Sequence, residues 1–214
     1  MSSRTGRNIQ RYAATTRINH WIVAISFVLL ALSGLSLFHP AFFWLTNLFG
    51  GGPWTRILHP FIGVGMVAAF ALLAREMWQD NTWQPRDSIW LRKIKDVINN
   101  REENLPEVGR YNAGQKLLFF AMVACLIVLF VSGIVIWRVY FSSLFSVRLI
   151  RISSLLHAFC AFVLICAIII HIYAAIWVKG SIRAMTRGWV SPGWAWKHHR
   201  AWFREAGKGV HSKQ

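Results

Sequence analysis

The sequence predicts an all-α membrane protein in which four membrane-spanning helices form a bundle. Hydrophobic residues make up 55% of its 214 residues and charged residues only 15%, and the apolar residues gather in four long runs. About 20 apolar residues, at about 1.5 Å each, cross the hydrocarbon core of a bilayer. We therefore predict helices over residues 18–38, 55–77, 113–137 and 149–178, within a single membrane domain 1–214 that ends in a tail 179–214.

The first helix is predicted to stay in the mature protein. The segment before it, MSSRTGRNIQRYAATTR, is basic and contains no acidic residue, as in a signal peptide. However, the apolar run after it is too long for a signal peptide, and no A-x-A-like cleavage site follows. We expect an uncleaved membrane helix.

A polar loop of about 35 residues separates the second and third helices and contains six of the eight acidic residues. Within this loop apolar residues recur at helical spacing among Lys and Arg, which predicts a short helix on the membrane surface. These residues are Ile89, Trp90, Ile94, Val97 and Ile98. No internal repeat is evident along the chain.

The positive charge of the chain predicts its topology. A net charge of +16 could indicate nucleic-acid binding in a soluble protein, but here 20 of the 24 Lys and Arg residues lie in the termini and the second loop. Only Arg56, Arg138, Arg148 and Arg151 lie in the first and third loops. This asymmetry predicts that both termini of the membrane protein lie in the cytoplasm. It also predicts attraction to anionic lipid, and we expect no nucleic-acid partner.

Four histidines fall at two depths in the predicted bundle. His157 and His171 are fourteen residues apart on one helix, so they face within about 40° of each other and are about 21 Å apart along the axis. His20 opens the first helix and His59 the second. The topology therefore pairs His20 with His171 near the cytoplasmic face and His59 with His157 near the outer face.

Two histidines from facing helices match the axial ligation of a haem iron. A zinc ion would need further ligands, typically Cys or carboxylate, and neither depth offers them. The chain has no C-x-x-C-H motif for covalent haem, and Cys125, Cys160 and Cys166 all lie in apolar runs, where they fit as small apolar side chains. The alternative for each histidine is a hydrogen-bonded packing role.

Other residues fit a haem site less specifically. Gly34, Gly63 and Gly133 fall in the outer half of the helices, where they either leave flat room for a macrocycle or allow close helix packing. Arg56, Arg138 and Arg151 could face haem propionates from the outer side. His39 faces about 100° away from His20, which favours a loop or interfacial role. We expect His198, His199 and His211 to be solvated in the basic tail.

Several motifs together resemble the cytochrome b (gamma) subunit of membrane-bound respiratory formate dehydrogenases, over nearly the whole chain. The motifs are RINHW, ALSGLS, TRILHPFIG, GRYNAGQK, SGIVIWR, LLHA and IIHIYAAIWVKGSIRAM. The resemblance implies two b haems, with His59 and His157 holding the outer one and His20 and His171 the cytoplasmic one. It also implies that electrons arrive from an iron–sulfur (beta) subunit, itself served by a molybdopterin (alpha) subunit, and leave to menaquinone near the cytoplasmic face.

The resemblance places the quinone site at Asn112 and Gly114, with Gln115 and His171 nearby. Free N–H groups at a helix N-terminus and an Asn side chain can donate to a quinone oxygen. The alternative is that Asn112 only caps the third helix.

The function expected is that of an electron-transfer and quinone-reducing subunit of an oxidoreductase complex in anaerobic respiration. Formate oxidation would belong to partner subunits, since the chain has no iron–sulfur or molybdopterin motif. One alternative is the cytochrome b subunit of a nickel–iron hydrogenase or thiosulfate-reductase-type complex. Another is a haem-free membrane anchor or transporter, which would tolerate loss of the histidines.

Overall fold

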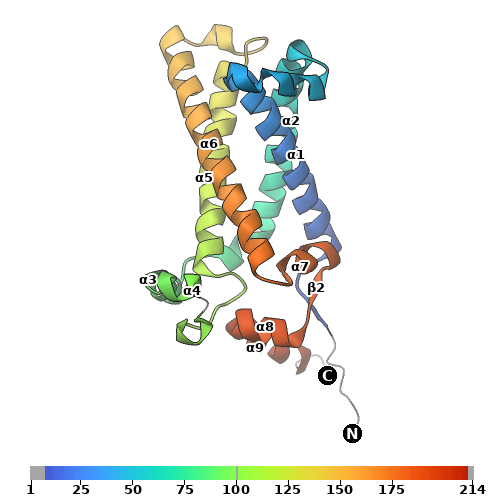
Figure 1. Cartoon of the computed structure of the whole chain (residues 1–214), viewed down its shortest axis with the longest axis vertical. Coiled ribbons are helices and arrows are strands. Elements are labelled where there is room, and N and C mark those ends of the chain that lie inside the picture. Colours follow the sequence, from blue (N-terminus) through green and yellow to red (C-terminus); the bar gives the residue numbers. More distant parts are fainter. Residues whose placement is uncertain (1–7, 100, 212–214) are drawn as a thin grey trace. The chain divides into compact units, whose positions relative to one another are not determined.

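A computed structural model describes residues 8–99 and 101–211, and four long helices dominate it (Figure 1). They are α1 (Ala14–Phe38), α2 (Gly52–Met77), α5 (Ala113–Ile136) and α6 (Val147–Trp177). Within the described residues these four helices are long and apolar enough to cross a membrane, as predicted. α1, α2 and α6 begin two to four residues before the predicted starts, because hydropathy does not register a polar or glycine-containing first turn.

The chain divides into two compact units. The membrane unit comprises Ile18–Arg75 and Ala121–Ile172, which hold most of the length of the four long helices. The terminal unit comprises the described parts of Met1–Arg17, Glu76–Phe120 and Tyr173–Gln214.

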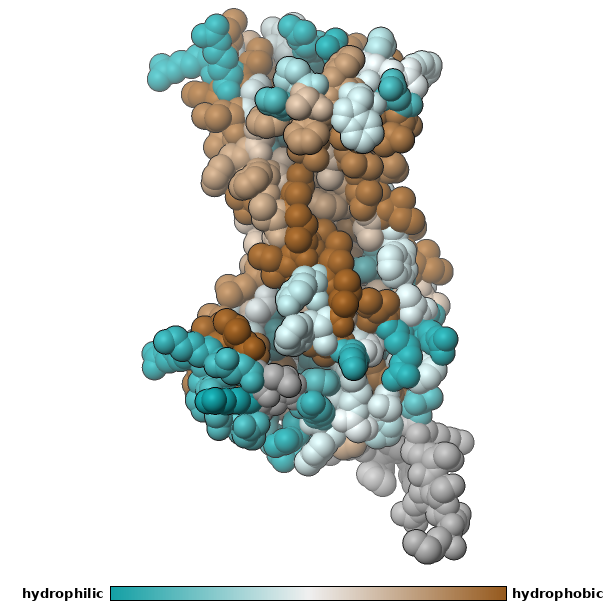
Figure 2. All heavy atoms as spheres, viewed as in Figure 1, coloured by the Kyte–Doolittle hydropathy of each residue, from teal (hydrophilic) through white to brown (hydrophobic). Residues whose placement is uncertain are grey.

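The core of the membrane unit draws on all four helices. The buried side chains Met66, Phe70, Cys125, Leu126 and Leu164 come from α2, α5 and α6, and α1 adds partly buried residues such as Phe27. Large apolar side chains also face outward from the same helices, and Figure 2 shows them along this part of the chain. A helix that is apolar on all sides suits a lipid environment.

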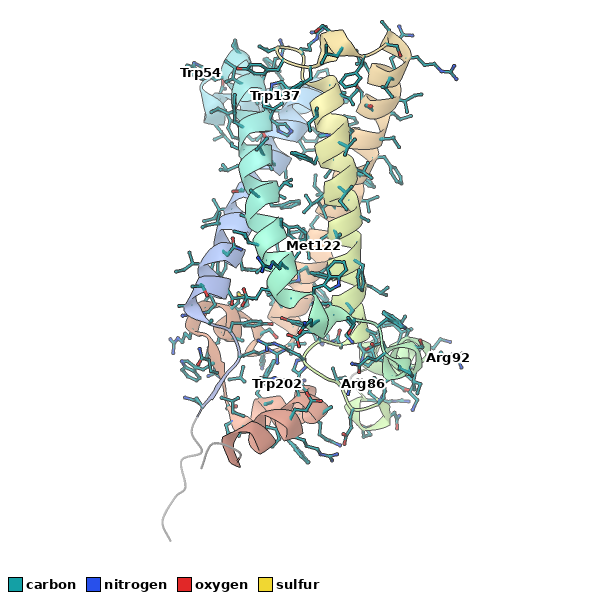
Figure 3. All side chains as sticks on the ribbon, turned by 180° about the vertical axis from the view of Figure 1, so that it is seen from behind. Trp54, Arg86, Arg92, Met122, Trp137 and Trp202 are labelled. Carbon is teal, nitrogen blue, oxygen red and sulfur yellow. The ribbon has the colours of Figure 1, made fainter. Side chains whose placement is uncertain are left out.

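Aromatic residues gather at one end of the membrane unit. Trp137 contacts Phe61 and Tyr140 with ring centres 5.2 Å away in both cases. Trp54 and Trp137 lie at this same end in Figure 3. Such residues are enriched where a membrane meets water.

Two short helical segments connect the long helices of the membrane unit. η1 (Pro40–Phe49) is a 3₁₀ helix whose first turn is capped by His39, the Nδ1 of which accepts a hydrogen bond from the Ala41 N–H at 3.2 Å. η1 ends at Gly50 and Gly51, which have φ angles of 85° and 97° that glycine adopts without strain. η4 (Ser142–Leu144) precedes α6.

The terminal unit is built from short elements. They are β1 (Ile9–Gln10), η2 (Gln79–Asn81), α3 (Pro85–Arg92), α4 (Ile94–Ile98), η3 (Glu102–Asn104), α7 (Ser181–Arg187), β2 (Trp189–Val190), α8 (Pro192–His198) and α9 (Arg200–His211). The predicted surface helix is present as two pieces, α3 and α4. The break occurs because Lys93 leaves the helical conformation, with φ −99° and ψ 22°.

The tail after α6 folds against the start of the chain. β1 and β2 pair antiparallel, with Ile9 opposite Val190. The Gly188 carbonyl accepts the N–H groups of Arg11 and Tyr12 at 2.8 and 3.1 Å. A Cβ at Gly188 would lie 2.8 Å from the Tyr12 carbonyl oxygen, and φ is 86°, so glycine is required there. Around this pair the buried residues Tyr12, Tyr111, Ala184, Val190, Ala195 and Trp202 form a second core.

Candidate cofactor site: two pairs of facing histidines

The membrane unit brings the four histidines together in the two predicted pairs. The ring centres of His59 on α2 and His157 on α6 are 6.3 Å apart, with ring planes at 62°. The ring centres of His20 on α1 and His171 on α6 are 6.5 Å apart, with ring planes at 51°. α6 therefore contributes one histidine to each pair.

The separation within each pair fits a single metal ion between two imidazoles. Two rings that each bind one ion through a nitrogen, at about 2 Å, hold their centres about 6 Å apart. The described residues contain no group of three or more His, Cys, Asp or Glu side chains that could surround an ion. Each pair thus offers two axial ligands, which suits an iron whose other ligands come from a macrocycle.

A serine on α1 fixes the ring of His59. Ser33 is fully buried, and its Oγ lies 2.8 Å from Nδ1 of His59. The same Oγ donates to the Leu29 carbonyl oxygen at 2.7 Å. A hydroxyl has one proton, so the histidine must be the donor in the contact between the two side chains. His59 therefore carries its proton on Nδ1 and a free electron pair on Nε2, the form that binds a metal ion.

A second serine makes the same arrangement on α5. The Oγ of Ser132 lies 3.0 Å from Nδ1 of His157 and donates to the Val128 carbonyl oxygen at 2.6 Å. His157 is thus held in the same tautomer as His59.

The glycine after each serine lies against the ring that the serine holds. A Cβ at Gly34 would be 3.4 Å from Cε1 of His59, and a Cβ at Gly133 would be 3.5 Å from Cε1 of His157. A Cβ at Gly63 would meet only Leu30, at 3.9 Å. Two of the three predicted glycines therefore border the histidine rings, whereas Gly63 does not.

The other pair has different surroundings. Nδ1 of His20 is buried and has no hydrogen-bond partner among the described residues. The Trp21 ring meets the His20 ring edge to face, with centres 5.5 Å apart. The preceding residue, Asn19, donates from its side chain to the Ala69 carbonyl oxygen at 2.9 Å and ties α1 to α2.

A cavity of about 390 Å³ opens near the end of α1 that leads into η1. His39 and Arg56 line it together with the apolar side chains of Leu37, Phe38 and Phe43. His39 also caps η1, in keeping with the predicted loop role.

The residues predicted to contact quinone lie together in the first turn of α5, within the terminal unit. Oδ1 of Asn112 accepts the Gln115 N–H, and Oε1 of Gln115 accepts the Asn112 N–H, both at 2.9 Å. This reciprocal pair is the capping role considered for Asn112. The side-chain NH₂ groups of both residues have donors to spare. Gly114 lies against Trp90, whose ring would be 3.4 Å from a Cβ there.

The next residue of α5 forms an ion pair that sequence reasoning did not identify. Nζ of Lys116 lies 2.8 Å from Oδ2 of Asp87 and donates to the Thr82 carbonyl oxygen at 2.9 Å. Both side chains are at most 5% exposed. Oδ2 of Asp87 also accepts the Gln84 N–H at 2.7 Å, so the pair ties the start of α3 to the start of α5.

The prediction that His199 is solvated was wrong: only 4% of this residue is exposed. Its Nδ1 donates to the Gly109 carbonyl oxygen at 2.8 Å, and its Nε2 accepts from Arg11 at 3.3 Å. Burial first, and the Arg11 charge second, lower the pKa of His199 to about 3. The side chain of His211 lies outside the described residues.

Arg11 itself is a buried cation surrounded by aromatic rings. Its guanidinium lies 4.7 Å from the ring centre of Trp202 and 5.3 Å from that of Trp194, and it also contacts Tyr12 and Tyr111. It donates to the Arg110 carbonyl oxygen at 2.5 Å. Burial and the neighbouring Tyr12 raise the pKa of Tyr111 and keep that phenol neutral, so ring faces and the Arg110 carbonyl oxygen stabilise the cation.

Comparisons with known proteins give consistent matches. The family described as prokaryotic cytochrome b561 matches residues 11–188. The formate dehydrogenase cytochrome b556(fdo) subunit of Escherichia coli K12 is 46% identical over 205 residues, 96% of each chain. The nitrate-inducible formate dehydrogenase cytochrome b556(Fdn) subunit of the same strain is 43% identical over 198 residues, 92% of this chain and 91% of the relative. The formate dehydrogenase cytochrome b556 subunit of Haemophilus influenzae is 42% identical over 197 residues, 92% of this chain and 83% of the relative.

Proposed function

This chain belongs to the prokaryotic cytochrome b561 family, and on that premise we propose that it is the diheme cytochrome b subunit of a formate dehydrogenase complex. Family membership implies haem b as the cofactor, and the four apolar helices make the chain a membrane protein. The chain would act as one diheme membrane domain that passes electrons from an iron–sulfur subunit to menaquinone. Two histidine pairs, with ring centres 6.3 and 6.5 Å apart, are the observation that carries this proposal.

In this proposal each pair holds the iron of one haem. His59 and His157 serve the outer haem, while His20 and His171 serve the cytoplasmic one. When bound, the haems supply one-electron carriers at two depths of the membrane. The chain's own residues supply the axial nitrogens, and the apolar core around Met66 and Phe70 keeps water away from the path between the pairs.

The first turn of α5 is proposed as the quinone site. Gly114 N–H is one of the donors that a helix leaves free at its start. The NH₂ groups of Asn112 and Gln115 can donate to a quinone oxygen, since only the side-chain oxygens are engaged in the cap. Replacing Asn112 by Ala is expected to slow quinone reduction without changing haem content, and unchanged quinone kinetics would limit Asn112 to capping.

The orientation and the partners are also part of the proposal. The excess of Lys and Arg in the termini and the second loop supports a cytoplasmic location for both termini, in a bacterial inner membrane. The relatives' names support an assembly with other subunits of a formate dehydrogenase. The proposed partners are an iron–sulfur subunit and, through it, a molybdopterin subunit, which would deliver electrons from formate on the outer side.

The test is a haem count on the purified complex. A dithionite-reduced minus oxidised spectrum and a pyridine haemochrome assay should give two b haems for each copy of this chain. A single haem would contradict the diheme proposal, and absence of haem from the assembled complex would support the anchor alternative.

A further inference from the structure

We propose that Ser33 and Ser132 are positioning residues for the His59–His157 pair: each serine holds its histidine in the tautomer that offers Nε2 to the iron, and so tunes the haem bound there. This inference rests on the proposed haem site. It goes further by assigning a role to two buried hydroxyls that touch neither haem iron nor quinone.

The direction of the proton in each contact carries the argument. Carbonyl oxygens only accept hydrogen bonds, so each serine must donate its single proton to the backbone carbonyl one turn earlier, at 2.7 Å for Ser33 and 2.6 Å for Ser132. The serine oxygen is then an acceptor for Nδ1–H of the histidine, at 2.8 and 3.0 Å. The backbone of the helix thereby dictates which nitrogen of the imidazole keeps the proton.

The arrangement occurs twice, on different helices. Ser33 on α1 holds the histidine 26 residues later on α2, and Ser132 on α5 holds the histidine 25 residues later on α6. In both cases the next residue is a glycine whose missing side chain makes room for Cε1 of the ring. The chain therefore does contain a local repeat, which the sequence pattern alone did not reveal.

The repeat explains why two small residues occur together. Serine supplies the acceptor for Nδ1, and a larger residue after it would push against the ring edge at 3.4 Å in the case of Gly34. With Nδ1 engaged and Cε1 against the helix, the ring can rotate little about its bond to the chain. Nε2 is left as the nitrogen that faces the partner histidine.

An acceptor on Nδ1–H also strengthens the histidine as a ligand. A hydrogen bond to the far nitrogen raises the basicity of the coordinating nitrogen, and loss of such partners typically weakens metal binding 10–100-fold. A more basic ligand favours the oxidised iron. Removal of either serine hydroxyl should therefore raise the reduction potential of the haem held by this pair and leave the other haem unchanged.

The experiment compares three single variants of the full chain in its complex: S33A, S132A and S36A. Ser36 is a matched control, because it is 2% exposed, lies one turn from Ser33 on α1 and donates to a backbone carbonyl, that of Ser33, at 2.6 Å. Among the described residues, its hydroxyl makes no hydrogen bond to a histidine. Spectroelectrochemical titration measures both haem potentials in each variant, with the His20–His171 haem as internal reference.

At a given potential, we expect S33A and S132A each to lower the oxidised-to-reduced ratio of the His59–His157 haem by up to about tenfold. This corresponds to a rise of about 59 mV in the reduction potential of a one-electron couple. S36A should leave both potentials as in the wild type. Low-temperature electron paramagnetic resonance should show a changed low-spin signal for the same haem only. Loss of that haem in S33A or S132A, with full retention in S36A, would also support the proposed role.

Two outcomes would overturn the inference. One is an unchanged potential and signal for both haems in S33A and S132A. The other is an equal change in S36A, which would reduce the serines to packing residues. Failure of the proposed function looks different, since a haem count below two in the wild-type complex would refute the diheme reading before any serine variant is compared.

Discussion

His199 and His59 are both buried histidines, yet their two ring nitrogens are used differently. His199, in the terminal unit, donates from Nδ1 to the Gly109 carbonyl oxygen and accepts at Nε2 from Arg11. His59, in the membrane unit, donates from Nδ1 to Ser33, and no described residue hydrogen-bonds its Nε2. Both ring nitrogens of His199 are hydrogen-bonded within the protein. Nε2 of His59 is left available to bind a partner.

The contrast separates a structural histidine from a proposed ligand histidine better than burial does. Both ring nitrogens of His199 are hydrogen-bonded, Nδ1 as a donor and Nε2 as an acceptor, so a metal ion could bind Nε2 only by displacing the Arg11 guanidinium. His157 is held in the same way by Ser132, at 3.0 Å, and the ring of His59 faces it with the ring centres 6.3 Å apart. His20 differs again, because its Nδ1 is buried without a hydrogen-bond partner in the described part of the chain.

The largest effect is expected from replacing one histidine of each kind, the proposed ligand His157 and the structural His199. If the proposed diheme assignment holds, replacing His157 by Ala should remove one of the two haems completely, because a single axial histidine is left, and the His20–His171 haem should stay. Replacing His199 by Gln should leave both haems in place. Haem counts and optical spectra of the purified variants distinguish these results, and two haems in the His157 variant would refute the ligand assignment.

A smaller effect, which should depend on the size of the introduced side chain, is expected at Gly133 beside the His157 ring. Replacing Gly133 by Leu should lower occupancy of the His157 haem, since the added side chain meets a ring 3.5 Å from the Cβ position. Replacing Gly133 by Ala should be tolerated, because 3.5 Å is an ordinary contact distance for a methyl carbon. Equal occupancy in the Leu variant would show that this glycine serves helix packing alone.

The buried His199 should make the stability of the terminal unit depend on pH. His199 has a pKa of about 3 when folded and about 6.5 in an unfolded chain, so the unfolded chain binds more protons between these values. Stability of the terminal unit should therefore fall as the pH drops from 6.5 toward 3, by at most roughly 1.4 kcal/mol per pH unit. Hydrogen exchange of the Arg11 and Tyr12 amides would follow this loss. The His199→Gln variant is the control, and an equal pH dependence in it would place the effect elsewhere.

The smallest effect should be a difference in reduction potential between the two proposed haems of the unaltered protein. Ser33 and Ser132 strengthen the ligands of one pair, while Nδ1 of His20 has no such acceptor among the described residues. The His59–His157 haem should therefore have the lower reduction potential. The difference is about 59 mV for each tenfold difference between the two haems in the ratio of oxidised to reduced iron at one potential. That order would make electron flow toward the other pair downhill. A redox titration that gave the opposite order would show that burial outweighs the serine contacts.

The histidine pairs join residues 98 and 151 positions apart, and they could be predicted because the alternating direction of the helices assigns each histidine a depth. The four helices could be predicted because they depend on local rules. Hydropathy determines the apolar runs, and helical periodicity determines which way His157 and His171 face. The capping role of Asn112 is equally local, since its partner is three residues away. Such features need no knowledge of distant contacts.

The features that were missed depend on contacts between distant segments. Burial of His199 requires residues 11 and 109, which are 188 and 90 positions away. Sequence alone shows Arg11 and His199 as charged or polar residues in basic segments, so solvation was the natural expectation. The serine contacts were missed because a serine inside an apolar helix resembles any small residue until its partner is known.

The paired serine and glycine give a signature that can be read in other chains. A Ser-Gly dipeptide inside an apolar run, followed 25 or 26 residues later by a histidine in the next run, describes both hairpins of the membrane unit. A single helical hairpin of this kind is half of a ligand set, complete only when a second hairpin faces it. Two copies in one chain, or one copy in a symmetric dimer, would meet that requirement, so the spacing offers a search criterion for haem-binding membrane hairpins that share no other similarity.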